Sequence, residues 1–400
     1  MLYTVSKPLA IWFGTGRDME AGSPLDRGFL IALLCLSLLI LLKRQVNWFS
    51  AIRENIWLLF LIGYMLVSIL WSDIPNISFR RWVRELDAVV MSFLVLSERN
   101  RRQALQSILR RAIYILIPFS LLLIKYYPKY GCDYSHWSGQ QMWIGVTLHK
   151  NGLCLLCIIS ALFLIWTLIR RRQGRDIPIA KYQIYVEVFL LFLTLWILAG
   201  PQKTFTNSAT SSVAFAVGLS AMAGLFWMKK RGLKLRANTL KVIVALIIVY
   251  GTVTPMVGGL SLLDVSSALG RDETLTGRRD IWSILVPLAM KQPLLGHGIG
   301  GFWTDAMRNL SASHAHNGYL EVLLSLGFVG LFLVFMFLLS CCDKAQRALS
   351  DDFDWGVLFI CYLLMAVVHN ITEPSINTLT SSMTAVILFF AISFSDVFSS

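Results

Sequence analysis

The sequence predicts an all-α protein that crosses a membrane many times. Its 400 residues are 56% hydrophobic and only 15% charged, with a mean hydropathy of +0.64, whereas soluble domains have about 25% charged residues. The apolar residues stand in long runs, close to the roughly 17–25 residues that a helix needs to cross a bilayer. Only helices and closed barrels can span lipid, and these runs are too long and too uniformly apolar for barrel strands. We therefore expect about 11–12 helical spans in a single integral membrane domain over residues 1–400.

Eleven apolar runs are candidate spans. The first run is short, and the partly apolar residues 1–16 could add a stub that dips into the membrane. These residues lack the basic start and the cleavage site of a signal peptide. The predicted spans are residues 28–42, 56–71, 83–97, 112–126, 150–169, 184–199, 209–228, 239–256, 317–340, 355–371 and 376–395.

Lys and Arg are distributed unevenly between the two sets of alternating connections. One set contains 21 of the 36 basic residues, and such segments stay in the cytoplasm. This topology accounts for the net charge of +13 without a nucleic-acid partner. The basic segments are 43–55, 98–111, 170–183, 229–241 and 341–354. The segments that then face outward are 72–82, 127–149, 200–208, 257–316 and 372–375.

The outward segment 257–316 is too long to be a passive connection. It contains five Lys or Arg and five Asp or Glu, so its net charge is zero when its histidines are neutral. Residues 278–290 predict an amphipathic helix in which Trp282 and Leu285 share the apolar face and Arg278 lies one turn before Trp282. A helix of this kind is typical of the membrane interface. We therefore predict a large outer loop whose chemistry depends on individual residues.

The strongest candidate site is the segment HAHN (314–317), which opens the ninth predicted span. Histidine can accept a proton near neutral pH, so His314 and His316 are candidate catalytic residues. Asn317, a candidate for substrate binding, shares a helix face with Glu321, because the two residues are four apart. The alternative interpretation is that both histidines are interfacial polar residues that cap the helix.

Charged residues in the outward segments form a second candidate group. Arginine stays charged and can bind a phosphate through two N–H groups, so Arg278 and Arg271 in GRDETLTGRRDIW (270–282) are candidates. The alternative is that these are solvated charges on a helix. Ionisable groups close to the membrane interior are costly and are candidates for function. The further candidates for substrate binding are Arg80, Arg81, Lys150, Lys203 and Glu373.

Two other patterns do not predict a bound cofactor. The segment GHGIGG (296–301) resembles a dinucleotide fingerprint, but no strand precedes it and it faces outward. His314 and His316 are two residues apart, and the sequence shows no third metal ligand beside them. We therefore expect no metal and no other cofactor.

These segments resemble the O-antigen ligase and exopolysaccharide (O-antigen) polymerase family of bacterial membrane glycosyltransferases. The resemblance extends over most of the chain, and the order of the motifs makes it more specific than any one of them. GRDETLTGRRDIW looks most like the exopolysaccharide polymerase branch. The matching segments are WSDIPNISFRR (71–81), LHKNG (148–152), GRDETLTGRRDIW (270–282), PLLGHGIGGFW (293–303), HAHNGYLEVLLSLGFVGL (314–331) and NITEPS (370–375).

The resemblance implies an all-helical, GT-C-like membrane glycosyltransferase in the bacterial cytoplasmic (inner) membrane, with its active site facing the periplasm. The donor is then an oligosaccharide on undecaprenyl diphosphate. The acceptor is another carrier-linked repeat unit in the polymerase branch, which we favour, and lipid A–core in the ligase branch. The resemblance implies neither a metal nor a nucleotide sugar, and it makes membrane lipids and other polysaccharide assembly proteins candidate partners.

The resemblance also suggests roles for individual residues. His316, next to an asparagine, matches the family's essential histidine, and Arg278 in the TGR triplet matches its loop arginine. Arg80 and Arg81 stand where the family has basic residues near the outer face. The sequence departs from the family at Ala209, where a Lys or Arg usually stands between serines, and Lys203 is the candidate substitute.

The residues fit this chemistry independently of the resemblance. A lipid diphosphate leaves readily when preorganised cations hold its growing negative charge. The attacking sugar hydroxyl needs a base, for which His316 is suited, and His314 would orient the acceptor or His316. One displacement with one base predicts inversion at the anomeric carbon, and the outer loop shows no paired carboxylates of the hydrolase type.

Two interpretations from other classes stay open at this point. A transporter or flippase for a lipid-linked sugar or small anion explains the eleven spans and the buried charges equally well. It does not explain a 60-residue outer loop that ends in HAHN. A membrane anchor for a polysaccharide assembly complex explains neither feature.

Overall fold

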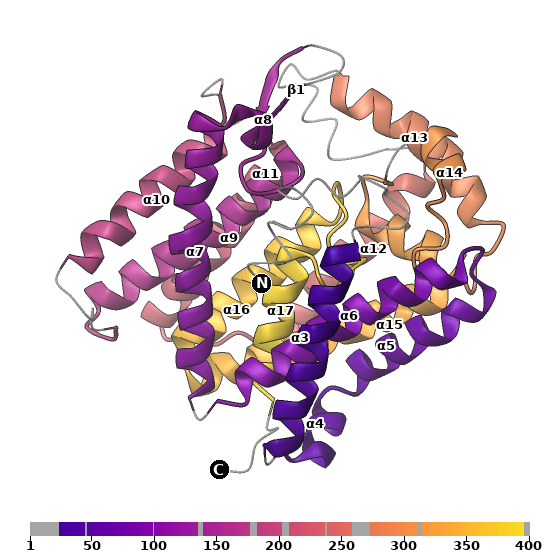
Figure 1. The fold of residues 1–400 in the computed structure, drawn as a ribbon. Helices are drawn as coiled ribbons and strands as arrows, with labels where there is room; N and C mark the ends of the chain where they lie inside the picture. Colours follow the sequence, from indigo (N-terminus) through magenta and orange to yellow (C-terminus); the bar gives the residue numbers. More distant parts are fainter. Residues whose placement is uncertain are drawn as a thin grey trace.

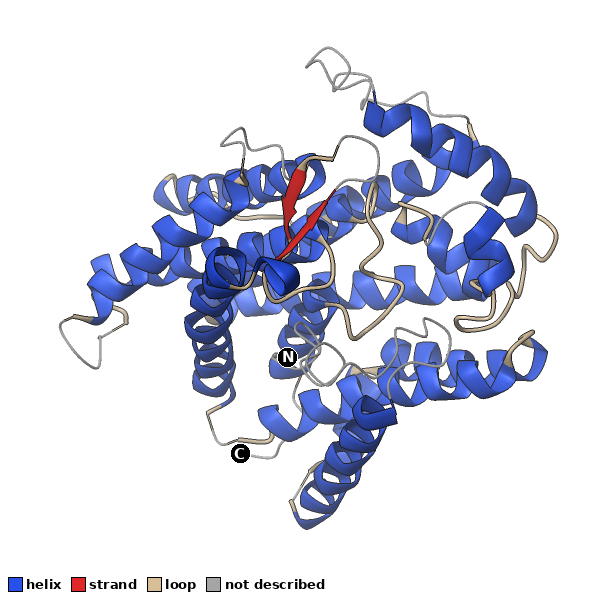
Figure 2. Ribbon diagram, turned by 45° about the horizontal axis from the view of Figure 1, so that its top comes forward, coloured by secondary structure: helices blue, strands red, loops and turns tan. Residues whose placement is uncertain are grey.

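The computed structural model describes residues 24–44, 46–98, 100–134, 139–176, 182–201, 208–236, 238–257, 273–310 and 314–395. Helices make up most of this part, so the predicted all-α membrane fold is confirmed (Figure 1). Two short strands, β1 (Cys132–Tyr134) and β2 (Gln141–Trp143), form an antiparallel hairpin (Figure 2). The helices are α3 (Pro24–Lys43), α4 (Trp48–Glu54), α5 (Ile56–Val67), the 3-10 helix η1 (Ser68–Trp71), α6 (Pro75–Leu96), α7 (Arg101–Tyr126), α8 (Pro128–Gly131), α9 (Lys150–Arg172), α10 (Gln183–Ala199), α11 (Ala209–Lys230), α12 (Thr239–Met256), α13 (Glu273–Ala289), α14 (Asp305–Leu310), α15 (Gly318–Asp351), α16 (Phe353–His369) and α17 (Ser382–Ser393).

Each of the eleven predicted spans coincides with a helix. Six of the described helices are long and apolar enough to cross a bilayer, and the bent pair of α4 with α5 and η1 adds a seventh candidate. The helices α10, α16 and α17 are apolar but shorter. The remaining predicted span, 83–97, belongs to α6, which begins eight residues earlier at Pro75.

Helix α6 is longer than its apolar stretch. Proline at the first helical position is preorganised for a helix, and here it starts α6 ahead of Arg80, Arg81 and Arg84. These arginines therefore lie along the helix rather than in the connection before it. The apolar pattern alone could not show this start, because a helix continues through charged residues that face away from lipid.

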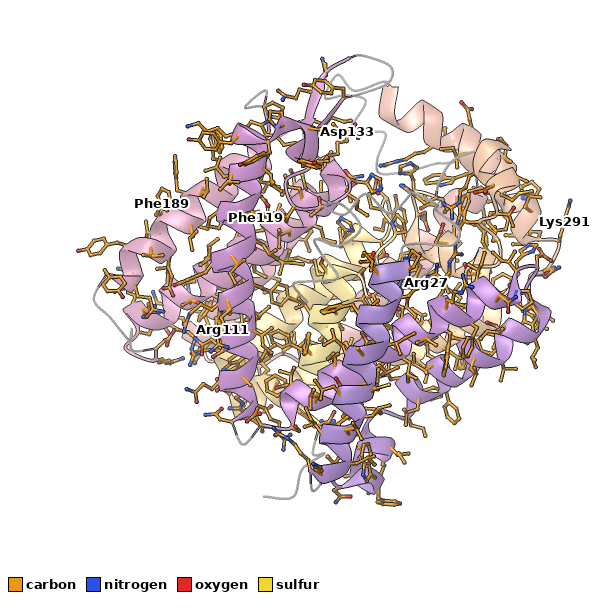
Figure 3. The ribbon with its side chains drawn as sticks, in the orientation of Figure 1. Arg27, Arg111, Phe119, Asp133, Phe189 and Lys291 are labelled. Atoms are coloured by element: carbon orange, nitrogen blue, oxygen red, sulfur yellow. The ribbon has the colours of Figure 1, made fainter. Side chains whose placement is uncertain are left out.

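Helix α16 lies at the centre of the bundle. Nearly all of its side chains are buried, and it packs against α11 and α15 (Figure 1). Helices α10 and α12 instead expose large apolar side chains. Tyr185, Phe189 and Phe192 of α10 are 75%, 61% and 70% exposed, and Phe189 points away from the neighbouring helices (Figure 3). An apolar outer face of this kind suits contact with lipid, whereas a soluble protein would rarely expose it.

Segments that the charge distribution predicts to face outward meet at one end of the bundle, where β1, α8 and α13 lie (Figure 1). There the hydroxyl oxygens of Thr210 and Thr372 are 2.6 Å apart. The predicted cytoplasmic segments meet at the other end, near α4. Ion pairs join them, including Arg347 with Glu54 at 2.7 Å and Arg102 with Asp352 at 2.9 Å. These ion pairs therefore join predicted cytoplasmic segments to one another.

The GHGIGG segment has a structural role. Helix α15 is broken at Gly327, whose φ of 65° is in the left-handed region that favours glycine. The segment before GHGIGG fills this break, because Pro293 and Leu294 accept hydrogen bonds from Phe328 and Val329. A Cβ on Gly296 would lie 2.5 Å from the Gly327 nitrogen, so only glycine permits this close approach.

Candidate active site

The HAHN segment forms a tight turn directly before α15. Asn317 caps the helix, because its side-chain oxygen accepts a hydrogen bond from the Leu320 amide at 2.8 Å. His316 has a φ of 50°, which is unusual for a residue with a side chain. Its amide donates to His314 Nδ1 at 3.3 Å, and the two imidazole rings are 3.9 Å apart between centroids. The turn therefore holds two histidine rings against each other at the outer end of α15.

Glu373 completes a cluster with His316 and Arg278. It lies in the turn after α16, and its Oε1 is 3.1 Å from His316 Nδ1 and 3.1 Å from Arg278 Nη2. The side chains of Glu373, Arg278 and His316 are 7%, 18% and 28% exposed, respectively. One carboxylate thus joins a histidine that is still accessible to an arginine on the amphipathic helix α13.

The protonation of this cluster follows from its surroundings. Burial by itself would raise the pKa of Glu373, but the hydrogen bond and charge of His316 and the charges of His314 and Arg278 lower it to about 2. Glu373 is therefore ionised at neutral pH and can only accept hydrogen bonds. His316 Nδ1 must then carry the proton, which leaves the lone pair of Nε2 to act as a base.

His314 and Arg278 respond differently to the same burial. Desolvation, with the charge of His316, lowers the pKa of His314 to about 4, so His314 is neutral at pH 7. Burial also lowers the pKa of Arg278 from its ordinary value, while Glu373 opposes this shift. An arginine stays protonated even so. The cluster therefore combines a cation, Arg278, with an anion, Glu373, and a neutral histidine, His314, around His316.

His314, His316 and Glu373 also form a group that could hold a metal ion. Their candidate ligand atoms all lie within 4.8 Å of one another, and two histidines with one glutamate can bind Zn²⁺. The sequence did not show Glu373 as a third ligand, because it is 57 residues from His316. However, Arg278 bonds to Oε1 of the same carboxylate at 3.1 Å. A divalent cation in this group would thus lie close to a guanidinium, whose positive charge opposes it.

Two other predicted site residues, Asn317 and Lys150, each begin a helix near the cluster. Asn317 is fully buried, and its amide nitrogen donates to the carbonyls of Gly251 and Ile371 at 2.8 and 2.9 Å. It therefore fastens the helix start to two neighbouring segments. Lys150 is the first residue of α9, and the charge of the preceding His149 is felt at His314. The start of α9 is thus close to the cluster.

Arg80 and Arg81 lie side by side in sequence but differ in environment. Arg80 is exposed, whereas Arg81 donates from Nη1 to the carbonyl of Gly300 in the GHGIGG segment. Lys203 and Arg271 lie outside the described residues, as does much of the loop before α13. The structure therefore brings His316, Arg278, His314 and Glu373 together and leaves Arg80 and Arg81 on a neighbouring helix.

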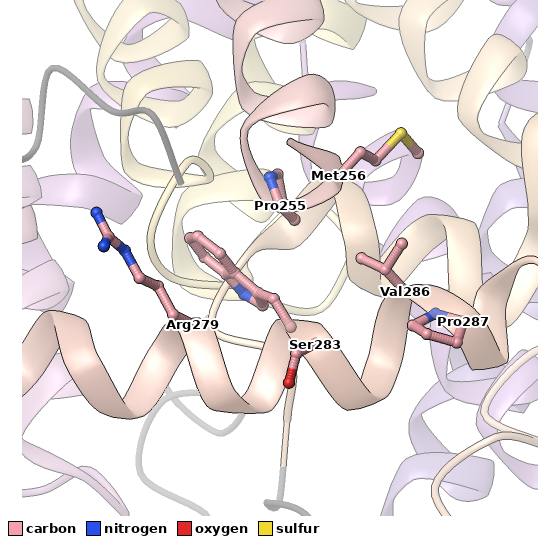
Figure 4. Close-up of a pocket in the computed structure, with 7 residues that line it drawn as sticks. Pro255, Met256, Arg279, Ser283, Val286 and Pro287 are labelled. Carbon is pink, nitrogen blue, oxygen red and sulfur yellow. The ribbon is translucent and has the colours of Figure 1, made fainter. Parts of the chain in front are cut away.

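A cavity of about 240 Å³ lies between the end of α12 and helix α13 (Figure 4). Its lining is mainly apolar, with Arg279 as the charged member. Trp282 is part of this lining, and its indole nitrogen donates to the carbonyl of Ala315 in the HAHN turn at 2.8 Å. Trp282 therefore connects the cavity lining to the HAHN turn. The lining residues are Pro255, Met256, Arg279, Trp282, Ser283, Val286 and Pro287.

The spacing of residues along the sequence could not reveal the partnership of Glu373. An acidic residue at the outer end of an apolar span was the available signal, because such a charge is costly unless it has a function. Glu373 was thus predicted to contact substrate, whereas its partners in the folded protein are a histidine and an arginine.

Sequence comparison places this cluster in a known family context. Residues 203–335 match the family model described as O-antigen ligase, and this span contains Arg278, His314 and His316 but not Glu373. The exopolysaccharide production protein ExoQ of Rhizobium meliloti (strain 1021) is 22% identical over 313 residues, which are 75% of this chain and 67% of that protein. The chain is therefore a multi-pass membrane protein similar to the O-antigen ligase and exopolysaccharide polymerase family, as its motifs predict.

Proposed function

We propose that this protein is a membrane glycosyltransferase that moves a glycan from undecaprenyl diphosphate to an acceptor hydroxyl. The transfer takes place at the periplasmic face of the cytoplasmic membrane, in a bacterium. The observation that supports it best is the cluster in which Glu373 bonds to both His316 and Arg278. A base and a cation are the two groups that such a transfer requires from a protein.

The reaction consists of one displacement. The acceptor hydroxyl oxygen attacks the anomeric carbon of the donor, and the bond between that carbon and the diphosphate oxygen breaks. His316 Nε2 takes the hydroxyl proton, while Glu373 accepts the Nδ1 hydrogen bond and stabilises the imidazolium that forms. Undecaprenyl diphosphate leaves with the bonding electron pair, and Arg278 helps to hold its charge. A single displacement inverts the anomeric configuration.

The acceptor is most simply a second carrier-linked repeat unit, so that the product is a longer polysaccharide. The similarity to a protein named for exopolysaccharide production supports polymerisation. The match to the O-antigen ligase model keeps transfer to lipid A–core as the second candidate. Both candidates use the same donor and the same base, and they differ only in what presents the hydroxyl.

Purified protein in detergent tests both candidates. It is mixed with undecaprenyl diphosphate-linked repeat units, with EDTA present and without nucleotide, and the lipid-linked products are resolved by mass. Longer glycans on the carrier support polymerisation. Transfer only to added lipid A–core supports ligation.

A matched preparation of His316→Ala, inserted and folded like the wild type, identifies the base. Loss of product in this variant assigns transfer to the cluster. If wild-type protein joins neither acceptor but moves labelled donor across vesicles, the protein is a flippase and the proposal is wrong.

A further inference from the structure

The backbone of Ala315, which lies between the two histidines, forms hydrogen bonds through both its N–H and its carbonyl. Its N–H donates to Glu321 Oε2 at 3.0 Å, and its carbonyl accepts from the Trp282 indole at 2.8 Å. Ala315 is fully buried, so neither hydrogen bond competes with bulk water. This residue is the anchor of the HAHN turn.

Glu321 is fully engaged in this anchor. Its other oxygen, Oε1, accepts a hydrogen bond from the Trp303 indole, and the residue is 4% exposed. Neither oxygen faces the cavity or the histidine rings as a free acceptor. Glu321 therefore cannot serve as a second catalytic carboxylate, although it lies six residues from Ala315 and on the first turn of α15.

The anchor matters because the next residue has a strained backbone. His316 adopts a φ of 50°, and a residue with a side chain keeps such a conformation only when its surroundings fix it. Ala315 is bonded on the one side, and on the other side Asn317 caps α15. These fixed neighbours determine where the imidazole of His316 points and keep its Nδ1 3.1 Å from Glu373.

We propose that Glu321 is a positioning residue that sets the orientation of the His316 imidazole through the backbone of Ala315, with Trp303 holding Glu321 and Trp282 holding the Ala315 carbonyl. This inference rests on the proposed function, in which His316 is the base. Glu321 itself touches neither the substrate nor the reacting atoms. Its removal lets the turn relax and moves Nε2 away from the acceptor hydroxyl.

The test exploits the donors that Glu321 faces. In Glu321→Gln the amide oxygen can accept from Ala315, but the amide NH₂ then meets the Trp303 indole N–H, so that two donors oppose each other. Trp303→Phe removes one donor. The double variant Glu321→Gln with Trp303→Phe should therefore restore the bond to Ala315.

We expect Glu321→Gln to lower kcat about a hundredfold with KM for the lipid-linked donor changed less than about twofold, because misplacing a reacting group costs rate rather than binding. The double variant should recover about tenfold of that loss. Glu85→Gln is the matched control, since Glu85 is equally buried and also accepts from backbone amides, those of Leu379 and Thr380. Trp303→Phe should not rescue the Glu85 variant.

Amide hydrogen exchange of the peptide that contains Ala315 gives a readout independent of transfer. Faster exchange in Glu321→Gln, with slow exchange restored in the double variant, shows that Glu321 holds the turn. Recovery of exchange without recovery of kcat would overturn the positioning role, as would a wild-type kcat in Glu321→Gln. A wild-type protein without transfer activity would overturn the proposed function, and the positioning role with it, while the exchange data still decide whether Glu321 holds the turn.

Discussion

Replacing Glu373 by glutamine removes the charge that joins the base to the arginine. The side chain stays nearly the same size. The amide has one accepting oxygen, whereas the carboxylate has two. His316 and Arg278 both donate to the same Oε1 in the native protein. In Glu373→Gln, the single amide oxygen can still accept both hydrogen bonds, but the buried guanidinium loses its counter-ion and His316 no longer faces a negative charge.

The expected size of the effect follows from the pKa of Glu373. It lies at about 2 instead of 4.5, which favours the ionised form in the folded protein by about 3 kcal/mol. Because the folded pKa is depressed, this stabilisation is present above about pH 4.5 and is lost as pH falls toward 2. Glu373→Gln should lower the unfolding free energy at neutral pH by roughly 3 kcal/mol, the order of magnitude expected when one partner of a buried ion pair is removed. It should also lower kcat about a hundredfold, since a neutral amide no longer stabilises the imidazolium that His316 becomes.

The assay measures glycan transfer per folded protein, with thermal melting in the same detergent. Glu187→Gln is the matched control, because Glu187 is also a buried carboxylate paired with an arginine, Arg171, at 2.7 Å. It lies at the predicted cytoplasmic end of the span 184–199 and pairs with a cytoplasmic arginine, so its loss should lower stability but leave kcat unchanged. If the kcat of Glu373→Gln lay within threefold of wild type, as we expect for the control, the role of Glu373 as the partner of the base His316 would be refuted.

Three further variants test the other members of the cluster. His316→Ala should lower kcat by about a thousandfold while donor binding persists, since it removes the base; near-normal turnover would show that another group takes the proton. Arg278→Lys should lose most activity although its charge is kept, because a lysine cannot reproduce the guanidinium geometry; full activity would make Arg278 a surface charge only. His314→Asn should flatten the dependence of stability on pH. The pKa of His314 is about 4 instead of 6.5, so the unfolded chain binds more protons between these values and wild-type stability falls by up to about 3 kcal/mol as pH drops from 6.5 to 4. Equal slopes in melting experiments on both proteins would contradict this.

The sequence predicts the helical framework well because lipid imposes a length and an apolar composition on each span. The exception is α6, which begins at Pro75 and takes Arg80 and Arg81 into its second turn. The arginines interrupt the apolar signal without ending the helix. Periodicity therefore locates the apolar part of a span, whereas its true start depends on which face the charges occupy.

The site is only half predictable by the same means. His316 and Arg278 could be singled out because both lie in motifs, HAHN and TGR, of an unusually long outward segment. The link between them could not, because Glu373 is 57 residues from His316 and 95 from Arg278. Residues that pair across a long sequence separation form no local motif, so the sequence alone does not predict their contact. The same reason hides Trp282 and Glu321, whose shared partner is one buried peptide.

The pairing of Arg278 with Glu373 also changes how a diphosphate can be held. A guanidinium has five N–H donors, and the bond to Glu373 uses one of them, so Arg278 can contact the carboxylate and a phosphate oxygen together. A diphosphate has more negative charge than a single arginine can offset, particularly one that already faces an anion. Lys150 at the start of α9 is a described cation that can add to it, since its neighbour His149 lies close enough to affect the pKa of His314. We therefore expect the donor to approach between α9 and α13, with Arg278 between its leaving group and the base.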